Sequence, residues 1–231
     1  MATQVVDAAQ GFRDAERKQV SMLAAAEKKT LVWLAGRLPA WVNSDHLTLL
    51  GFAAMFAAGL LYWVASWDRR ALIGVIAALA VNWFGDSLDG TLARVRNRLR
   101  PRYGFYVDHV TDAIGTFFLM GGLALSGYMN PFIALGLLIA YLLLSIEVYL
   151  TTYTIGKFHL SFWSFGPTEL RLLLCLGNLA IFLRGPAAKL AGREFLLFDI
   201  GGICGIVGMS AMLVWAALRH TRQLYEAERL P

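Results

Sequence analysis

Six long apolar segments, separated by short polar stretches, dominate the pattern along the chain. They cover residues 47–66, 71–95, 104–127, 132–155, 167–183 and 200–218. A helix of about 20 apolar residues crosses the hydrocarbon layer of a bilayer. Gly166-Pro167 and Gly185-Pro186 fall between segments, where these residues favour turns. The pattern therefore predicts an all-α integral membrane protein, with six transmembrane helices forming one bundle over residues 44–219.

The first 43 residues mix apolar and basic side chains instead. The apolar ones include Val5, Val6, Phe12, Val20, Met22 and Leu23, and the basic ones include Arg13, Arg17, Lys18, Lys28 and Lys29. Such a helix lies on a membrane surface, with its cations near anionic headgroups. We expect an amphipathic interfacial helix in residues 1–43 and a cytoplasmic tail over residues 220–231. A solvated leader is the alternative for the first region.

Composition and charge agree with a membrane protein. Of the 231 residues, 58% are hydrophobic and 16% are charged, whereas soluble domains average about 45–50% and about 25%. With six spans and the N-terminus inside, 16 of the 21 lysines and arginines lie on the inner side. That bias predicts cytoplasmic termini. The sequence pI of about 9.4 then reflects membrane topology, and we expect no nucleic-acid partner.

Four aspartates interrupt two neighbouring apolar segments. Asp86 and Asp89 are three residues apart near the end of the second segment, which places them about 60° apart around a helix. Asp108 and Asp112 are four residues apart near the start of the third, about 40° from alignment. The two helices are antiparallel and joined by a short loop, so both pairs reach the same depth in the membrane. The four carboxylates can therefore converge.

Converging carboxylates need a compensating cation. An aspartate near the middle of a spanning helix costs about 2.5–3.5 kcal/mol on insertion scales, and mutual repulsion adds to that cost. Hard oxygen ligands suit Mg²⁺, Mn²⁺ or Ca²⁺ rather than Zn²⁺. Mg²⁺ commonly keeps open positions and recruits substrate phosphates. Two such ions holding a pyrophosphate would account for the buried charge.

Small residues and one arginine surround the aspartates. Gly90, Ala93 and Gly104 remove side-chain bulk, which lets a ligand approach the backbone closely. Arg94 follows Gly90 by about one turn and can bring a guanidinium to a phosphate. Taken alone, Arg94 is better explained as one more interfacial charge in the basic run 94–102, but the four acids beside it favour a phosphate contact.

These residues carry a resemblance to a known family. The sequence Asp86-x-x-Asp89-Gly90-x-x-Ala93-Arg94, then nine residues, then Gly104-x-x-x-Asp108-x-x-x-Asp112, resembles the complete signature of the CDP-alcohol phosphotransferases. The stretch Ser44-Asp45-His46-Leu47-Thr48-Leu49-Leu50-Gly51 also resembles the start of the family's first span. It departs from the family's usual Pro-Asn at Ser44-Asp45, which bears on the subfamily.

The resemblance implies a six-helix enzyme of phospholipid biosynthesis, often a homodimer, with a polar site facing the cytoplasm. It implies that Asp86, Asp89, Asp108 and Asp112 bind two Mg²⁺ ions, with Mn²⁺ as a substitute. By the same resemblance, the CDP-binding residues are Asp86, Gly90, Ala93, Arg94, Gly104 and Asp108. Asp112 would be the general base that deprotonates the acceptor hydroxyl, so that attack on the distal phosphorus expels CMP. A bacterial inner membrane is the expected location.

The acceptor is less constrained by the sequence. Lys157, His159 and Arg171 are candidate acceptor-binding residues at the cytoplasmic ends of the fourth and fifth segments, and each is equally well explained as a positive-inside anchor. Glu147 lies well inside the fourth segment, where an ionisable residue suggests a functional site. Pairing with a basic or hydroxyl group inside the bundle would explain Glu147 equally well.

Two donor chemistries fit. Either CDP-diacylglycerol gives a phosphatidyl group to a small polar alcohol, which we favour, or a CDP-choline or CDP-ethanolamine type donor gives its phospho-head group to diacylglycerol. An intramembrane prenyltransferase also uses aspartates, Mg²⁺ and a diphosphate, but we would expect more spans there. A divalent-cation transporter could use the same carboxylates as an ion path.

Overall fold

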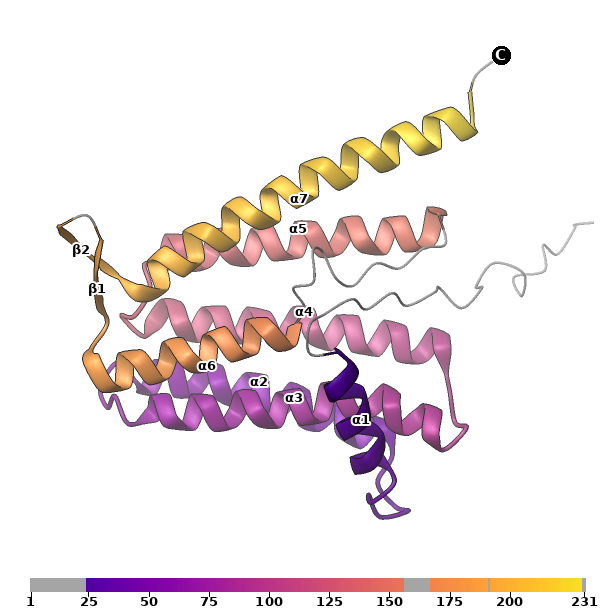
Figure 1. Ribbon diagram of the computed structural model, residues 1–231, viewed down its shortest axis with the longest axis horizontal. Helices are drawn as coiled ribbons and strands as arrows, with labels where there is room; N and C mark the ends of the chain where they lie inside the picture. Colours follow the sequence, from indigo (N-terminus) through magenta and orange to yellow (C-terminus); the bar gives the residue numbers. More distant parts are fainter. Residues whose placement is uncertain (1–23, 156–166, 191, 230–231) are drawn as a thin grey trace, which may run out of the picture.

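The computed structural model describes residues 24–155, 167–190 and 192–229. These residues form seven helices and one hairpin (Figure 1). In chain order the elements are α1 (Ala24–Ala35), α2 (Ser44–Val64), α3 (Ala71–Val95), α4 (Pro101–Leu125), α5 (Pro131–Ile155), α6 (Pro167–Arg184), β1 (Ala187–Leu190), β2 (Arg193–Leu196) and α7 (Leu197–Ala227). Most of the predicted amphipathic region, residues 1–23, lies outside the described residues, and α1 covers part of the remainder.

Helix-starting residues set the beginnings of four long helices. The Asn43 side chain accepts a hydrogen bond from the His46 backbone N–H at 3.0 Å, and the His46 ring accepts one from the Asn43 N–H at 3.4 Å. This reciprocal pair satisfies donors at the start of α2. Pro101, Pro131 and Pro167 are the first residues of α4, α5 and α6, where the missing N–H would have no partner within the helix. The predicted segments therefore begin within three residues of the observed helices.

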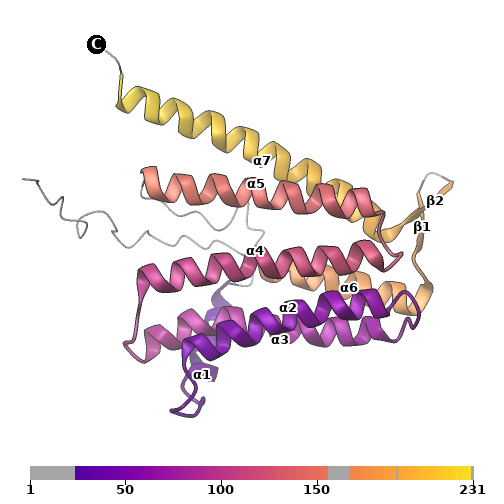
Figure 2. The same ribbon diagram turned by 180° about the vertical axis from the view of Figure 1, so that it is seen from behind.

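The long helices pack in a chain of neighbours around α2. Helix α2 lies between α3 and α4, α6 packs on α3, α5 packs on α4, and α7 packs on α5. Figures 1 and 2 show α7 diverging from the other helices toward its C-terminal end, while α1 runs across the bundle beside α3. Because α2 packs against both α3 and α4, the end of α3 and the start of α4 lie at the same end of the bundle. The aspartates are on these two segments.

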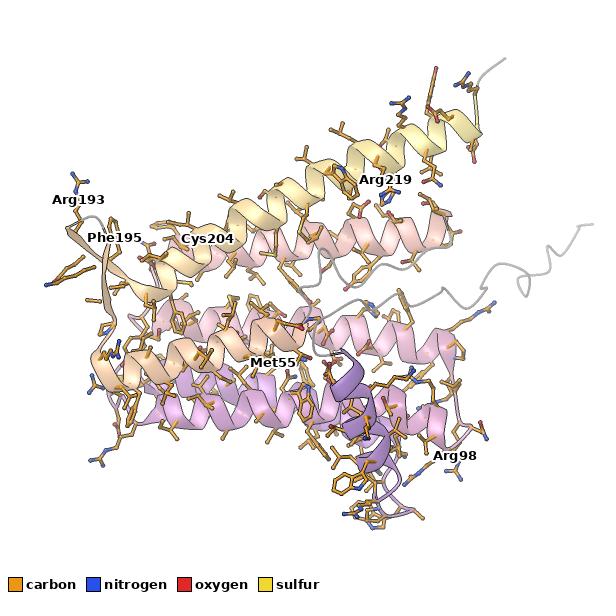
Figure 3. All side chains as sticks on the ribbon, in the orientation of Figure 1. Met55, Arg98, Arg193, Phe195, Cys204 and Arg219 are labelled. Atoms are coloured by element: carbon orange, nitrogen blue, oxygen red, sulfur yellow. The ribbon has the colours of Figure 1, made fainter. Side chains whose placement is uncertain are left out.

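Successive long helices run in opposite directions, so the two ends of the bundle differ. One end carries α1 and the α3–α4 loop with Arg98, and the other carries the β1–β2 hairpin with Arg193 (Figure 3). At the hairpin end, Asn130 N–H donates to Asp199 Oδ1 at 2.6 Å. All four signature aspartates lie toward the end that carries α1.

Glycines allow α2 to approach both of its neighbours closely. A Cβ added at Gly85 of α3 would lie 2.5 Å from the Leu47 carbonyl oxygen and 2.6 Å from the Gly51 nitrogen of α2. A Cβ added at Gly122 of α4 would lie 1.9 Å from the carbonyl oxygen of Gly59. Helix association in lipid depends on such close packing, because lipid tails are as apolar as the helix surfaces. The three helices that bear the site are therefore in backbone contact.

Two apolar clusters fill the interior. The larger lies toward the hairpin end and centres on Tyr62, Leu72, Leu123 and Ile181, all fully buried. The smaller joins α1 to the rest through side chains of α1, the α1–α2 linker, α2 and α3. Its buried members are Leu31, Ala35, Val42, Leu47, Leu88 and Leu92. The acidic site lies between these two clusters along α3.

A short hairpin accompanies the helices, and the predicted all-α membrane class still fits the fold. Residues 187–190 pair antiparallel with residues 193–196, with Ala187 opposite Leu196 and Leu190 opposite Arg193. Gly185 and Gly192, at φ values of 91° and 80°, make the bends before and within it, and positive φ is a conformation that glycine adopts without steric cost. Strands of four residues leave too short a pattern of alternation to be recognised from the sequence.

Four helices are long and apolar enough to cross a membrane by length and composition, namely α2, α3, α5 and α7. The chain is therefore a multi-pass membrane protein. Helices α4 and α6 have 25 and 18 residues, but they carry the charged side chains Asp108, Asp112 and Arg171. The six-span arrangement, in which α4 and α6 also cross, stays a prediction.

Candidate active site

Three of the four predicted acids converge between α3 and α4. Asp86, Asp108 and Asp112 each offer a carboxylate oxygen, and these oxygens all lie within 4.8 Å of one another. We call these three residues the acid cluster. Each is half-buried, so the cluster is partly shielded from solvent and still accessible to a ligand. The helical spacing that the sequence predicts brings both helices' acids to one depth.

Asp89 lies beside the acid cluster and is held by other groups. Its Oδ2 accepts a hydrogen bond from Thr48 Oγ1 of α2 at 2.6 Å, and its Oδ1 accepts one from the Gly90 N–H. Asp89 lines the same small cavity as Asp86, Asp108 and Asp112. Asp89 thus lies beside the three acids that could share one ion, and Thr48 of α2 orients its carboxylate.

The cavity at the acid cluster is small and mostly lined by oxygen-bearing side chains. Its volume is about 10 Å³, which is room for about one water-sized probe. Thr48, Asn82 and Thr111 add polar groups to the acids, and Phe52 and Met55 form an apolar wall. The side chain of Met55 lies in the middle of the bundle (Figure 3). Such a site can hold a small hard cation.

Arg171 of α6 reaches the acid cluster. One guanidinium nitrogen, Nη2, donates to Asp86 Oδ2 at 2.5 Å, and Nε donates to Asn82 Oδ1 at 2.8 Å. Asn82 is 3% exposed and donates through Nδ2 to the Gly51 carbonyl at 3.1 Å. The sequence suggested Arg171 as an acceptor-binding residue. In the structure it is a fixed partner of a predicted metal ligand.

A larger pocket of about 320 Å³ lies next to the acid cluster, between the start of α2 and the end of α3. Its lining comprises Asn43, Ser44, Asp45, Leu92, Ala93, Arg96, Arg98, Leu99 and Arg100. Ser44 precedes Thr48 by one turn, and Ala93 follows Asp89 by one turn. The pocket thus lies about one helical turn from Thr48 and Asp89. Arg100 pairs with Asp45 within its lining, and Arg96 and Arg98 leave the lining with a net positive charge.

The remaining predicted CDP-binding residues, Gly90, Arg94 and Gly104, are not among the residues that line these two cavities. A Cβ at Gly104 would meet nothing within 4 Å, so this position faces open space. Arg94 is exposed and donates from Nη2 to Thr91 Oγ1 at 3.2 Å. The open space at Gly104 leaves room for a ligand to approach the backbone at that position.

Among the candidate acceptor residues that the structure describes, Glu147 and Arg171 have different partners. Glu147 of α5 accepts a hydrogen bond from Thr151 Oγ1 at 2.9 Å, and its Oε1 lies 2.6 Å from His220 Nδ1 of α7. This geometry supports the reading in which Glu147 pairs within the bundle. Lys157 and His159 lie outside the described residues.

Sequence reasoning missed Asn82 and gave Thr48 no role. Asn82 stands in an apolar run one turn before Asp86, and a buried amide in a spanning helix signals an interhelical hydrogen bond. Thr48 is one turn from the start of α2, where a threonine is common and gives no sign of a functional role. Their contacts to Arg171 and Asp89 could be found only from the structure.

Comparisons with known proteins agree with the signature. Residues 41–220 match the model of the CDP-alcohol phosphatidyltransferase family. An archaetidylinositol phosphate synthase from Pyrococcus horikoshii is 29% identical over 89 residues, which are 38% of this chain. The match covers 44% of that relative's length. Since the family match spans most of the helical bundle, the chain belongs to the CDP-alcohol phosphatidyltransferase family.

Proposed function

We propose that the chain transfers a phosphatidyl group from CDP-diacylglycerol to the hydroxyl of a small polar alcohol, with release of CMP. The observation that carries the proposal is the acid cluster, in which three carboxylates from two helices meet within 4.8 Å. Members of this family take CDP-alcohol donors and alcohol acceptors within a membrane. The chemistry of the cluster matches a pyrophosphate-containing donor, because that group needs its negative charge neutralised during transfer.

The donor set at the cluster fits Mg²⁺, or Mn²⁺ in its place. The converging ligand atoms are carboxylate oxygens, which hard divalent cations prefer. Asp86, Asp108 and Asp112 would hold one ion, and Asp89 beside them would contribute to the second ion of a pair. When bound, such ions neutralise charge on the pyrophosphate and make CMP a better leaving group.

The neighbouring pocket provides a place for the nucleotide. Ala93 lines this pocket, and its volume of about 320 Å³ falls in the range of sites that bind small molecules. Arg98 also lines it and would contribute positive charge toward an anionic ligand, whereas Arg100 pairs with Asp45. Gly90 and Gly104, which the signature places in the CDP site, would give the ligand access to the backbone. The donor would thus extend from the acids toward the α3–α4 loop.

Asp112 is the proposed general base. Its carboxylate would take the proton from the acceptor O–H while the acceptor oxygen forms a bond to the distal phosphorus of the donor. The bond between that phosphorus and the CMP oxygen breaks, and its electron pair leaves with CMP. General-base catalysis of this kind contributes typically about 10²–10⁴-fold in rate.

The acceptor we favour is a polyol, and a phosphorylated one is supported by the relative named for archaetidylinositol phosphate. Transfer of a phospho-head group from CDP-choline or CDP-ethanolamine to diacylglycerol is the second candidate. The stretch Leu47–Gly51 at the start of α2 favours that alternative slightly.

The proposed setting is a bacterial inner membrane with the acid cluster toward the cytoplasm. The end of the bundle that carries the cluster also carries the basic α3–α4 loop, as the positive-inside rule requires. Exposed apolar side chains on α5 and α7, such as Leu150 at 59% and Val207 at 63%, offer surfaces for lipid or for the second subunit of a homodimer.

The test is CMP release by the purified full chain in detergent with Mg²⁺. CDP-diacylglycerol and the two CDP-aminoalcohols are each paired with a panel of polyols, polyol phosphates and diacylglycerol. We expect acceptor-dependent CMP from CDP-diacylglycerol, lowered about 100-fold or more in Asp112→Asn. Asp68→Asn, in the loop after α2, is the matched control and keeps full activity. Equal activity in both variants would refute the role of Asp112, and acceptor-dependent CMP only from a CDP-aminoalcohol would establish the second candidate.

A further inference from the structure

Helix α1 reaches the active-site helices through one carboxylate. Glu27 Oε1 accepts hydrogen bonds from Trp83 Nε1 at 2.8 Å and from Thr168 Oγ1 at 2.8 Å, and Ser87 Oγ donates to it at 3.4 Å. Trp83 and Ser87 belong to α3, and Thr168 belongs to the first turn of α6. A single oxygen atom of α1 therefore joins three helices that are far apart in the sequence.

Apolar packing fixes the position of α1 on α3. Leu31 and Ala35 of α1 are 7% and 2% exposed and share a buried cluster with Leu88 and Leu92 of α3. Because this packing holds α1 against α3, the carboxylate of Glu27 has a defined position along α3. Any hydrogen bond that Glu27 makes to α6 then sets where α6 lies on α3.

Stability alone does not account for a carboxylate at this point. Within the described part of the chain, Glu27 Oε2 is buried and makes no hydrogen bond. Burying a carboxylate with one oxygen unsatisfied is unfavourable, and a neutral or apolar group is commonly better for stability. The bridge is therefore better explained by the geometry that it imposes on its partners.

Those partners lie one turn or less from Asp86 or from Arg171, the residue that bonds to Asp86. Thr168 and Arg171 are three residues apart, so they are neighbours on the surface of α6. Trp83 and Ser87 flank Asp86 on α3. The two links between α3 and α6, Glu27 with Thr168 and Asp86 with Arg171, are thus adjacent, and a shift of α6 at the first would displace the second.

We propose that Glu27 is a positioning residue, which fixes the first turn of α6 and thereby holds Arg171 against Asp86. The inference rests on the proposed function, because the orientation of Asp86 matters here as that of a metal ligand. Arg171 and Asn82 act as the outer partners that orient this ligand. Partners of this kind commonly change metal affinity by about 10–100-fold when they are removed.

The experiment measures binding of Mn²⁺ alone to the purified full chain in detergent, by electron paramagnetic resonance. Arg171→Gln should weaken Mn²⁺ binding about tenfold or more. Thr168→Val, which keeps the shape of the side chain and removes only its hydroxyl, should weaken binding in the same direction. Thr168→Ser should restore wild-type affinity. Thr154→Val is the matched control, because among the described residues the Thr154 hydroxyl donates to the Leu150 carbonyl of its own helix α5.

The double variant Thr168→Val with Arg171→Gln decides whether the two residues act together. Binding no weaker than in Arg171→Gln alone is the expected result, because Thr168 acts through Arg171. Independent, multiplying losses would overturn the proposal, as would wild-type affinity in Thr168→Val or no Mn²⁺ binding by the unaltered chain. The expected binding pattern without CMP release from any donor would instead overturn the proposed function and leave the positioning role supported.

Discussion

The contact between α2 and α4 allows a sharp test of how the bundle is held together. A Cβ added at Gly122 would lie 1.9 Å from the carbonyl oxygen of Gly59 and 2.5 Å from its carbonyl carbon. Ordinary contacts between such atoms begin near 3.4 Å. Gly122→Ala therefore requires the two helices to separate by about 1.5 Å at this point, because both opposing atoms are backbone and cannot rotate away.

The expected cost follows from that separation. Overpacking a well-packed interior typically costs about 1–3 kcal/mol, and a clash with backbone on both sides places Gly122→Ala at the upper end. Gly121, the preceding residue, is the matched control, because a Cβ there would meet nothing within 4 Å. Alanine is favoured over glycine by about 1 kcal/mol in a helix interior. This gain applies to both variants and cancels, so they should differ by about 3 kcal/mol, with Gly121→Ala the more stable.

The assay is reversible unfolding of the full chain in mixed micelles, followed by far-ultraviolet circular dichroism during titration with sodium dodecyl sulfate. Since α2 carries Thr48 and α4 carries Asp108 and Asp112, the separation should also lower CMP release by Gly122→Ala in protein that is still folded. Equal unfolding midpoints for the two variants would refute the claim that backbone contact at Gly59 and Gly122 joins α2 to α4.

Two other contacts give predictions that can be tested on the same purified protein. Asn178 Nδ2 donates to the Tyr62 hydroxyl at 2.8 Å, with both side chains fully buried, so Tyr62→Phe should lower the free energy of unfolding by about 0.6–1.7 kcal/mol. An unchanged unfolding midpoint would contradict this. Arg96 donates to the carbonyls of Leu38 and Pro39 at 2.9 Å each, so Arg96→Gln should free the linker between α1 and α2 and speed tryptic cleavage after Arg37. Cleavage at the wild-type rate would show that other contacts hold the linker.

The beginnings of the long helices could be predicted from the sequence because local signals determine them. Pro131 and Pro167 mark helix starts whatever the helices pack against. The sequence positions of Asp86, Asp108 and Asp112 also determine which face of its helix each one lies on, since a helix turns through about 100° per residue. Knowing that two helices are neighbours is then enough to bring these acids together, as the structure confirms.

The partners of the acids could not be predicted, because they depend on how helices distant in sequence rotate against each other. Asp89 is only about 60° from Asp86 around α3, and that rotation turns it toward Thr48 of α2. Arg171 carries a positive charge that the positive-inside rule explains without any contact. Its pairing with Asp86 follows from the seat of α6 on α3, which no local pattern encodes.

Packing and chemistry share the same residues in this bundle. In lipid, helices associate through close packing and a few polar contacts, since burial of apolar surface gives no advantage over the acyl chains. Gly51 of α2 serves both requirements. A Cβ there would lie 3.2 Å from the Asp86 nitrogen of α3, and its carbonyl accepts the hydrogen bond from Asn82 that orients Arg171. A larger residue at position 51 would move α3 and its acid together, so the closeness of the backbones is itself a condition for the geometry of the acid cluster.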